Sequence, residues 1–190
     1  MFIRDSPMPF IPFRDLPRPD DSGQPLAWGT WGESDQLGTL NHVTEAVTLA
    51  AAACIRRGAR FNLDLPLHLP FELVTEGAFG ERGAPQHTLH SNDYRSLLMR
   101  DDKLDEFYLQ GSSQWDGLTH IGNPLVGGFY NGVRPEQLSL DAQTRNGIEH
   151  VAEHAVATRG VLLDLPRYFG ATRRDWDPNN SDAVTADELA

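Results

Sequence analysis

The sequence predicts a mixed α/β fold, in which a β-rich layer is flanked by helices. Three segments carry this prediction: an alanine-rich stretch at 44–57, an amphipathic stretch at 147–157, and a nearly continuous apolar run at 161–165. The first two are typical of helices. A short apolar run is typical of a strand buried on both faces, which favours a mixed sheet over a sandwich of half-exposed sheets.

Both expected helices have recognisable ends. Thr44 is a residue type that caps a helix N-terminus, and Gly58 can adopt the left-handed conformation that ends a helix. The helix at 147–157 is expected to end before Gly160. A third helix is expected to begin at Thr185, with acidic residues in its first turn.

The remaining segments are read from their periodicity. Residues 61–67 alternate apolar and polar positions, which predicts a strand. Residues 70–95 are polar and predict a loop that holds His87, His90 and Asp93, whereas 97–110 fits either a helix or a strand. An extended segment is expected at 110–120.

The chain divides into an arm and one domain. Residues 1–27 contain six prolines, which predicts an extended arm. The arm's phenylalanines are expected to pack on its own domain or on a partner subunit. The domain is expected to span 28–190 and to be incomplete at its carboxyl end, because the sequence stops inside the first turn of the helix that begins at Thr185.

Composition excludes several classes of function. The chain has 190 residues and a net charge of −11, so it would be repelled by nucleic-acid phosphates and by anionic membranes. A single cysteine excludes an internal disulfide framework and a cysteine-based zinc finger. No apolar run approaches the roughly 20 residues that span a bilayer, and no signal peptide is recognisable. We therefore expect a soluble, cytoplasmic protein.

The densest group of chemically useful side chains lies between Gln110 and His120. Gln114, Asp116 and His120 occupy alternate positions there, so they would point the same way on an extended segment. An aspartate and a histidine placed in this way can bind one divalent ion or act as an acid/base pair. The alternative is a buried polar strand whose polar groups are satisfied by local hydrogen bonds.

This segment resembles the signature of the cyclase family of metal-dependent hydrolases, which includes kynurenine formamidases and isatin hydrolases. That signature reads His-x-Gly-Thr-His-x-Asp-x-Pro-x-His. Aligned without gaps, its first two histidines fall on Gln110 and Gln114, its aspartate on Asp116 and its last histidine on His120. The resemblance covers about residues 28–170 and includes blocks at 31–41, 130–132, 147–150 and 159–164.

The resemblance implies a swivelling β/β/α architecture and hydrolysis of an amide or lactone-type C–N or C–O bond. The family's leading substrate is an arylformamide of tryptophan catabolism. By the same resemblance, a Zn or Mn ion would be bound by Asp116, by His120 and weakly by Gln114, and His120 would be the acid/base residue or a further ligand. The substrate would contact Trp31, Gln110 and Tyr130, and the protein would form a homodimer or larger homo-oligomer.

Two departures from the family pattern leave other functions open. Two signature imidazoles are replaced by the carboxamides of Gln110 and Gln114, and the family's further His and Glu ligands come from a carboxyl-terminal third that has no counterpart in this sequence. The chain could therefore be a non-catalytic relative that binds a small molecule or serves as an assembly subunit. A minor alternative is a metallopeptidase, because His150-Val-Ala-Glu153-His154 fits the His-x-x-Glu-His motif.

Overall fold

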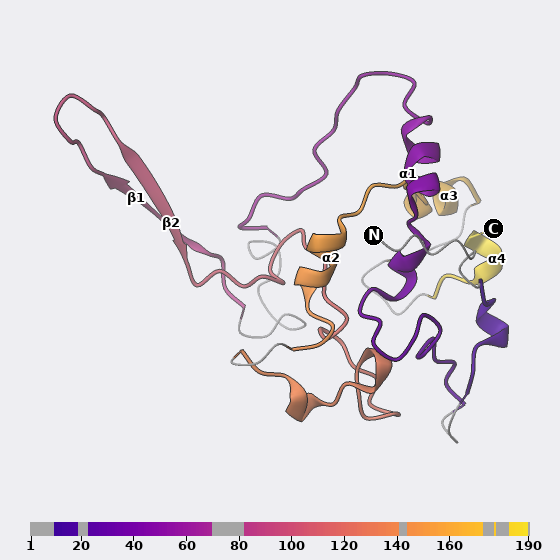
Figure 1. Cartoon of the computed structure of the whole chain (residues 1–190). Coiled ribbons are helices and arrows are strands. Elements are labelled where there is room, and N and C mark those ends of the chain that lie inside the picture. The colour runs from indigo at the N-terminus through magenta and orange to yellow at the C-terminus, as the bar shows by residue number, and fades with distance from the viewer. Residues whose placement is uncertain are drawn as a thin grey trace.

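The computed structural model describes residues 10–18, 23–69, 82–140, 144–172, 177 and 183–189. Over these ranges the chain combines helices with one small antiparallel sheet, which agrees with the predicted mixed α/β class (Figure 1). The swivelling β/β/α arrangement and the boundary between arm and domain stay predictions. The elements, in chain order, are η1 (Phe13–Asp15), η2 (Gly38–His42), α1 (Glu45–Ala52), β1 (Gln86–Ser91), β2 (Arg100–Asp105), η3 (Tyr130–Gly132), η4 (Pro135–Gln137), α2 (Ile148–His154), α3 (Leu165–Thr172) and α4 (Ala186–Leu189).

Both expected helices form, and both are shorter than predicted. The Thr44 hydroxyl accepts a hydrogen bond from the Val47 amide at 3.3 Å, which confirms Thr44 as the cap of α1. The helix ends at Ala52 rather than near Gly58, and the Arg56 guanidinium donates to the Ala53 carbonyl at 2.9 Å just beyond that end. In α2 the chain leaves the helix at Ala155, whose φ of 55° is incompatible with a right-handed helix.

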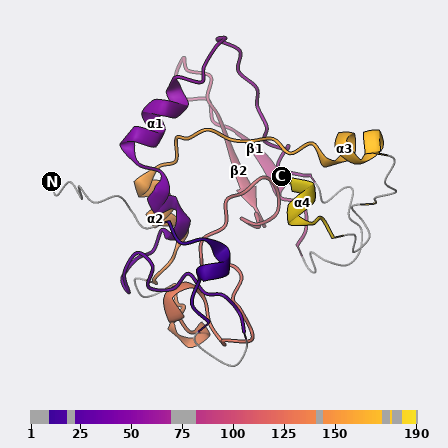
Figure 2. The ribbon, with the colours of Figure 1, turned by 90° about the vertical axis from the view of Figure 1, so that its right-hand side faces the viewer.

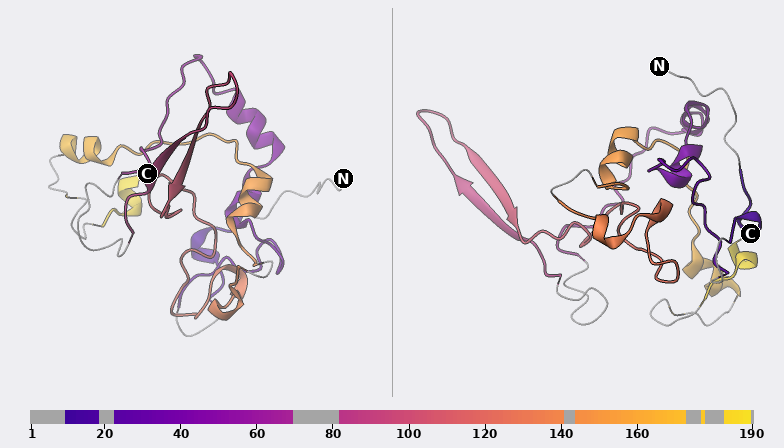
Figure 3. Two further views of the ribbon diagram at one scale, coloured as in Figure 1. Left: turned by 90° about the vertical axis from the view of Figure 1, so that its left-hand side faces the viewer. Right: turned by 60° about the horizontal axis from the view of Figure 1, so that its bottom comes forward.

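The only sheet among the described residues is the β1–β2 hairpin, and it corrects one prediction. Its antiparallel register runs from Gln86 opposite Asp105 to Ser91 opposite Arg100. Within the loop expected at 70–95, residues 86–91 form a strand, and residues 70–81 lie outside the described residues. The ambiguous stretch 97–110 contains a strand rather than a helix. The hairpin projects away from the helices (Figures 1 and 3).

The strands predicted at 61–67 and 161–165 are wrong. Neither segment pairs with another described segment, and a strand requires a hydrogen-bonded neighbour. Leu67 begins a turn, and Leu165 begins a helix. The apolar side chains of both segments are largely exposed: Leu63 is 89% and Leu162 88% accessible. An unpredicted helix, α3, begins at Leu165, and it lies well apart from α1 in Figure 2, although the two overlap in Figure 1.

The two ends of the chain are partly described. The ring centroids of Phe10 and His42 are 6.1 Å apart, but Phe10 and Phe13 are 79% and 73% exposed, so the surface on which these phenylalanines pack stays a prediction. Residues 1–9 and 19–22 of the arm lie outside the described residues. At the other end α4 is capped as predicted, because the Thr185 amide donates to Glu188 Oε2 at 2.8 Å and the Glu188 amide donates to Thr185 Oγ1 at 3.3 Å.

The buried core of the described residues is small and partly polar. Its apolar members are Leu26, Val133, Val151 and Phe169, and two asparagines, Asn131 and Asn146, are also buried. Buried polar side chains are usually hydrogen-bonded. We therefore expect hydrogen bonds of the two asparagines to connect the loops around them. No described helix is long and apolar enough to span a bilayer.

Candidate functional site

A network centred on Asp35 holds together the loops around the candidate site. The Tyr130 hydroxyl and the Gly38 amide each donate to Asp35 Oδ2 at 2.8 Å. The Asn41 side chain donates to Asp35 Oδ1 at 2.6 Å. The carboxylate therefore fixes the turn at 35–41 and attaches it to Tyr130, on a distant part of the chain.

Two buried asparagines extend this network. Asn131 accepts a hydrogen bond from the Gly29 amide at 2.8 Å and donates to the carbonyls of Gly32 and Asp35 at 3.1 and 3.0 Å. Asn146 is fully buried, and its side-chain amide donates to the Tyr130 carbonyl at 2.7 Å. Both have positive φ angles, 52° and 64°, a conformation that asparagine tolerates better than most residues.

The segment that carries the candidate catalytic residues passes directly against residues 146–148. At Gly117 an added Cβ would lie 3.0 Å from the Ile148 nitrogen and 3.1 Å from the Asn146 carbonyl oxygen. Only glycine allows this close approach without displacement of the backbone. The polar network and Gly117 together fix where Asp116 lies.

Asp116 and His120 come together through a turn, not on an extended strand as predicted. The His120 amide donates to the Gly117 carbonyl at 3.0 Å, and residues 117–120 are not paired in a described sheet. His120 Nε2 and Asp116 Oδ2 are 3.7 Å apart, and the two side chains are 26% and 36% exposed. The predicted proximity of this pair is therefore present, with a different backbone geometry.

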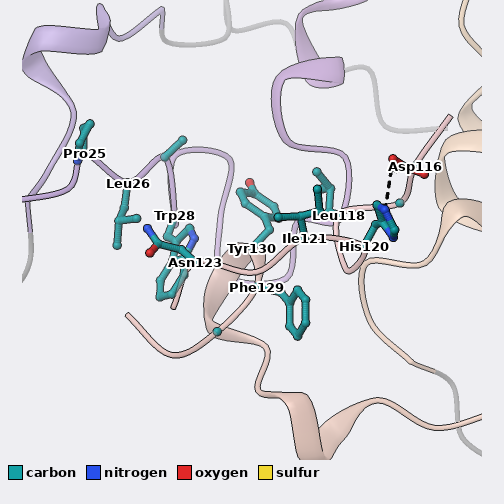
Figure 4. Close-up of a pocket in the computed structure, with 13 residues that line it drawn as sticks. Pro25, Leu26, Trp28, Asp116, Leu118, His120, Ile121, Asn123, Phe129 and Tyr130 are labelled. Atoms are coloured by element: carbon teal, nitrogen blue, oxygen red, sulfur yellow. Dashed lines mark ion pairs between the residues drawn. The ribbon is translucent and has the colours of Figure 1, made fainter. Parts of the chain in front are cut away.

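The Asp116–His120 pair lies between two cavities. One has a volume of about 360 Å³, and Figure 4 shows the pair at one end of it, Trp28 and Asn123 towards the other, and Tyr130 between them. The second has a volume of about 530 Å³. The residues that line the second cavity include Gln110, Gln114, Asp116, His120 and Ile148.

The structure gathers most of the predicted site residues, and Trp31 is the exception. Gln110, Gln114, Asp116 and His120 share one cavity, and Tyr130 lines the other. Trp31 lies outside both linings: its ring packs edge-on against His42 at 5.4 Å, and its buried indole nitrogen has no hydrogen-bond partner among the described residues. Trp115, which also lines the second cavity, is 58% exposed.

Tyr130 is held in its neutral form. Burial raises the pKa of its phenol well above the usual range, and the hydrogen bond to Asp35 and the negative charge of that carboxylate raise it further. Since the phenolic hydrogen is donated to Asp35, the Tyr130 oxygen can accept a hydrogen bond from a ligand but cannot donate one.

The fit of a metal ion to this site is partial. Among the described residues, no group of three or more His, Cys, Asp or Glu side chains is arranged to hold an ion. Asp116 and His120 supply two donors, whose separation of 3.7 Å is close to the ~3.3 Å expected for two ligands of one tetrahedral zinc. The Gln114 carboxamide lines the same cavity and is a weaker donor, better suited to Mn than to Zn.

The two other histidine groups singled out in the sequence do not form sites over the described residues. His87 and His90 lie on opposite faces of β1; His87 contacts Asp102 at 2.8 Å, whereas Asp93 pairs with Arg100 at 2.6 Å. In α2, no third described ligand joins His150 and His154.

Sequence reasoning missed the residues that build the site, namely Asp35, Asn131 and Asn146. A signal for the two asparagines was present, because each directly precedes a glycine, and Asn-Gly pairs are typical of left-handed turns. The role of Asp35 in the hydrogen-bond network could not be recognised from the sequence, because its partner Tyr130 lies 95 positions away.

Comparison with known proteins supports part of the predicted relationship. No protein-family model and no curated protein matches the chain. The chain is similar to a protein of known crystal structure described as a novel cyclase, with 31% sequence identity and a TM-score of 0.64. The match covers 76% of this chain and 49% of the other, so the chain spans about half the length of that cyclase. This similarity in sequence and structure supports a relation of the chain to the cyclase family.

Proposed function

We propose that the chain carries the site of a metal-dependent hydrolase of the cyclase type, which cleaves an amide or lactone-type C–N or C–O bond. The observation that carries the proposal is the Asp116–His120 pair, 3.7 Å apart in a cavity wall that Gln110 and Gln114 share. The relation to a cyclase of known structure supports it.

Asp116, His120 and Gln114 would hold the Zn or Mn ion. When bound, such an ion lowers the pKa of its water towards 7 and polarises the scissile carbonyl. If only Asp116 and Gln114 bind the ion, His120 can act as the general acid that donates a proton to the leaving nitrogen or oxygen. These two roles of His120 differ in one measurable quantity, the metal content of a His120→Ala variant.

The smaller cavity suits an aromatic substrate. Its volume of about 360 Å³ is within the range of small-molecule sites, and its lining includes the apolar side chains of Trp28, Ile121 and Phe129. The neutral Tyr130 would accept a hydrogen bond from an N–H of the substrate. An arylformamide, which joins a ring to a small amide, is the first substrate to test, and Gln110 and Trp31 stay candidate substrate contacts.

The test is hydrolysis of an arylformamide and of an aryl lactone in the presence of Zn²⁺ or Mn²⁺. Asp116→Ala and His120→Ala should each lower the rate at least 100-fold, whereas His154→Ala, on α2, should leave it near wild type. Loss of activity in the His154 variant alone would overturn the cyclase-type site and favour the peptidase alternative.

The second candidate is a non-catalytic relative that binds a small molecule or serves as an assembly subunit. It is favoured by the two glutamines in place of signature histidines and by the lack of a three-ligand cluster among the described residues. Calorimetric binding of an aryl amide without turnover, at any added metal concentration, would select this candidate over the hydrolase.

A further inference from the structure

The two buried asparagines of the polar network each stand directly before a glycine. Asn131 precedes Gly132, and Asn146 precedes Gly147. In a flexible chain, an asparagine before glycine cyclises more readily than one before any other residue, because glycine has no side chain to hinder its backbone nitrogen. Each pair is therefore a chemically reactive sequence that lies inside the fold.

Cyclisation at Asn131 is a reaction of the chain with itself, followed by hydrolysis. The Gly132 nitrogen attacks Cγ of Asn131, so that the N–Cγ bond forms and the Cγ–Nδ2 bond breaks. Ammonia leaves with the proton of the Gly132 amide. Water then adds across one C–N bond of the cyclic imide, which yields aspartate or isoaspartate. For the nitrogen to reach Cγ, Asn131 must rotate about its Cα–C and Cα–Cβ bonds.

The folded chain opposes both rotations. About Cα–Cβ, three hydrogen bonds of 2.8 to 3.1 Å hold the Asn131 side chain on the loop at 29–35. About Cα–C, the Gly132 amide donates to the Phe129 carbonyl at 3.0 Å, which fixes the turn and engages the hydrogen of the attacking nitrogen. Asn131 is also only 9% exposed. These contacts should keep the pair unreactive for as long as they last.

Conversion of Asn131 to aspartate would remove part of the same network. A carboxylate can accept from the Gly29 amide, but it has no N–H to donate to the carbonyls of Gly32 and Asp35. It would also bury a negative charge, which is costly without a partner. Isoaspartate adds one carbon to the main chain as well. Either product should therefore prevent the network from forming again.

We propose that Asn131–Gly132 is a deamidation site that the polar network protects, and that its reaction makes a lasting opening of this network irreversible. The Asp35 carboxylate controls the protection. It holds the turn at 35–41 on Tyr130, the residue before Asn131, so loss of that carboxylate should expose the pair without unfolding of the whole chain.

Tryptic mapping of protein incubated at pH 8 tests the proposal. Asn131 lies in the peptide 104–134. The other asparagine of that peptide, Asn123, precedes Pro124 and cannot react in this way, because proline has no N–H. The chain unfolded in guanidinium should deamidate at Asn131 at least tenfold faster than the folded chain. A smaller difference would overturn the proposal, because the fold would then give no protection.

Two variants distinguish local opening of the network from general instability. Asp35→Ala removes the central acceptor of the network, and Phe169→Leu weakens the buried core in α3. With denaturant added until both have the same free energy of unfolding, Asp35→Ala should deamidate at Asn131 at least tenfold faster than Phe169→Leu. Tyr130→Phe provides the same comparison if Asp35→Ala does not fold. Equal rates would show that only global unfolding exposes the pair, which would overturn the protective role of the network.

The variant Asn131→Asp reproduces one product of the reaction. It should unfold at a lower guanidinium concentration than Asn92→Asp, which makes the same change of charge at an exposed position. Equal midpoints would show that the product folds normally, and the claim of irreversibility would then be wrong.

Discussion

The phenol of Tyr130 donates its hydrogen to Asp35 Oδ2 at 2.8 Å, across 95 positions of the chain. This bond connects a residue that lines the smaller cavity with the carboxylate that organises the turn at 35–41. The candidate site therefore depends on a polar network more than on apolar packing, and the first predictions concern this network.

Asp35→Ala should lower the free energy of unfolding by about 2–3 kcal/mol, because it leaves the Tyr130 hydroxyl and the Gly38 amide without their acceptor. It also removes one of the two acceptors of the Asn41 side-chain amide, which keeps its bond to the Gly38 carbonyl. Urea unfolding measures the change. Glu136→Ala, at an exposed position in η4, is the control and should stay within about 0.5 kcal/mol of wild type. An Asp35 variant as stable as that control would show that the network does not hold the loops together.

The alkaline stability of the protein should reflect Tyr130. Unfolded tyrosine ionises near pH 10, whereas burial and Asp35 raise the pKa of Tyr130 in the folded state. The unfolded state therefore loses its proton first as the pH rises. The contribution of Tyr130 is complete below about pH 10 and declines above it.

Unfolding free energies measured from pH 8 to 12 test this sign. Tyr130→Phe should abolish part of the decline above pH 10, and Tyr108→Phe, at an exposed tyrosine, is the control for loss of one phenol. The same decline in the Tyr130→Phe protein and the wild type would contradict the assignment.

Local signals in the sequence predicted local structure well. Thr44 caps α1, the Thr185–Glu188 pair caps α4, and α2 lies inside the predicted 147–157, because each depends on residues only a few positions apart. These signals account for the helices of the mixed α/β class, whereas its strands form at 86–91 and 100–105 and not in the segments that predicted them.

Signals that depend on distant partners failed. The apolar patterns at 61–67 and 161–165 predicted strands, but a pattern cannot supply the neighbour that a strand must pair with. Residues 61–67 are held instead by side chains, since the Leu65 amide donates to Ser113 Oγ at 2.7 Å. At the site, the spacing of Asp116 and His120 predicted their proximity, whereas the turn that produces it depends on contact of Gly117 with residues 146–148.

Gly117→Ala should destabilise the protein by about 1–3 kcal/mol, because the new methyl group would press on the backbone of Asn146 and Ile148. Gly160→Ala is the matched control: an added Cβ there meets nothing within 4 Å among the described residues, so its effect should stay within about 1 kcal/mol. Thermal unfolding of both variants measures the difference. Equal stability of the two would exclude the close approach at Gly117.

Gln114→His should strengthen metal binding at least tenfold. The substitution adds an imidazole to the cavity wall that Asp116 and His120 already line, and imidazole binds Zn more strongly than a carboxamide does. Titration with Zn²⁺ against a competing chromophoric chelator measures the affinity. Gln137→His, at an exposed glutamine of η4, is the control for a histidine added elsewhere. No gain over that control would place the ion, if one binds, away from Asp116 and His120.

The central claim is that Asp116 and His120 form a divalent-ion site in the wall of a cavity. Elemental analysis of protein purified without chelator or histidine tag, after incubation with Zn²⁺ or Mn²⁺, tests it most directly. The account predicts close to one ion per chain in the wild type and in His154→Ala, and none in Asp116→Ala. A wild type that stays metal-free, or an Asp116→Ala variant that keeps its ion, would contradict the account.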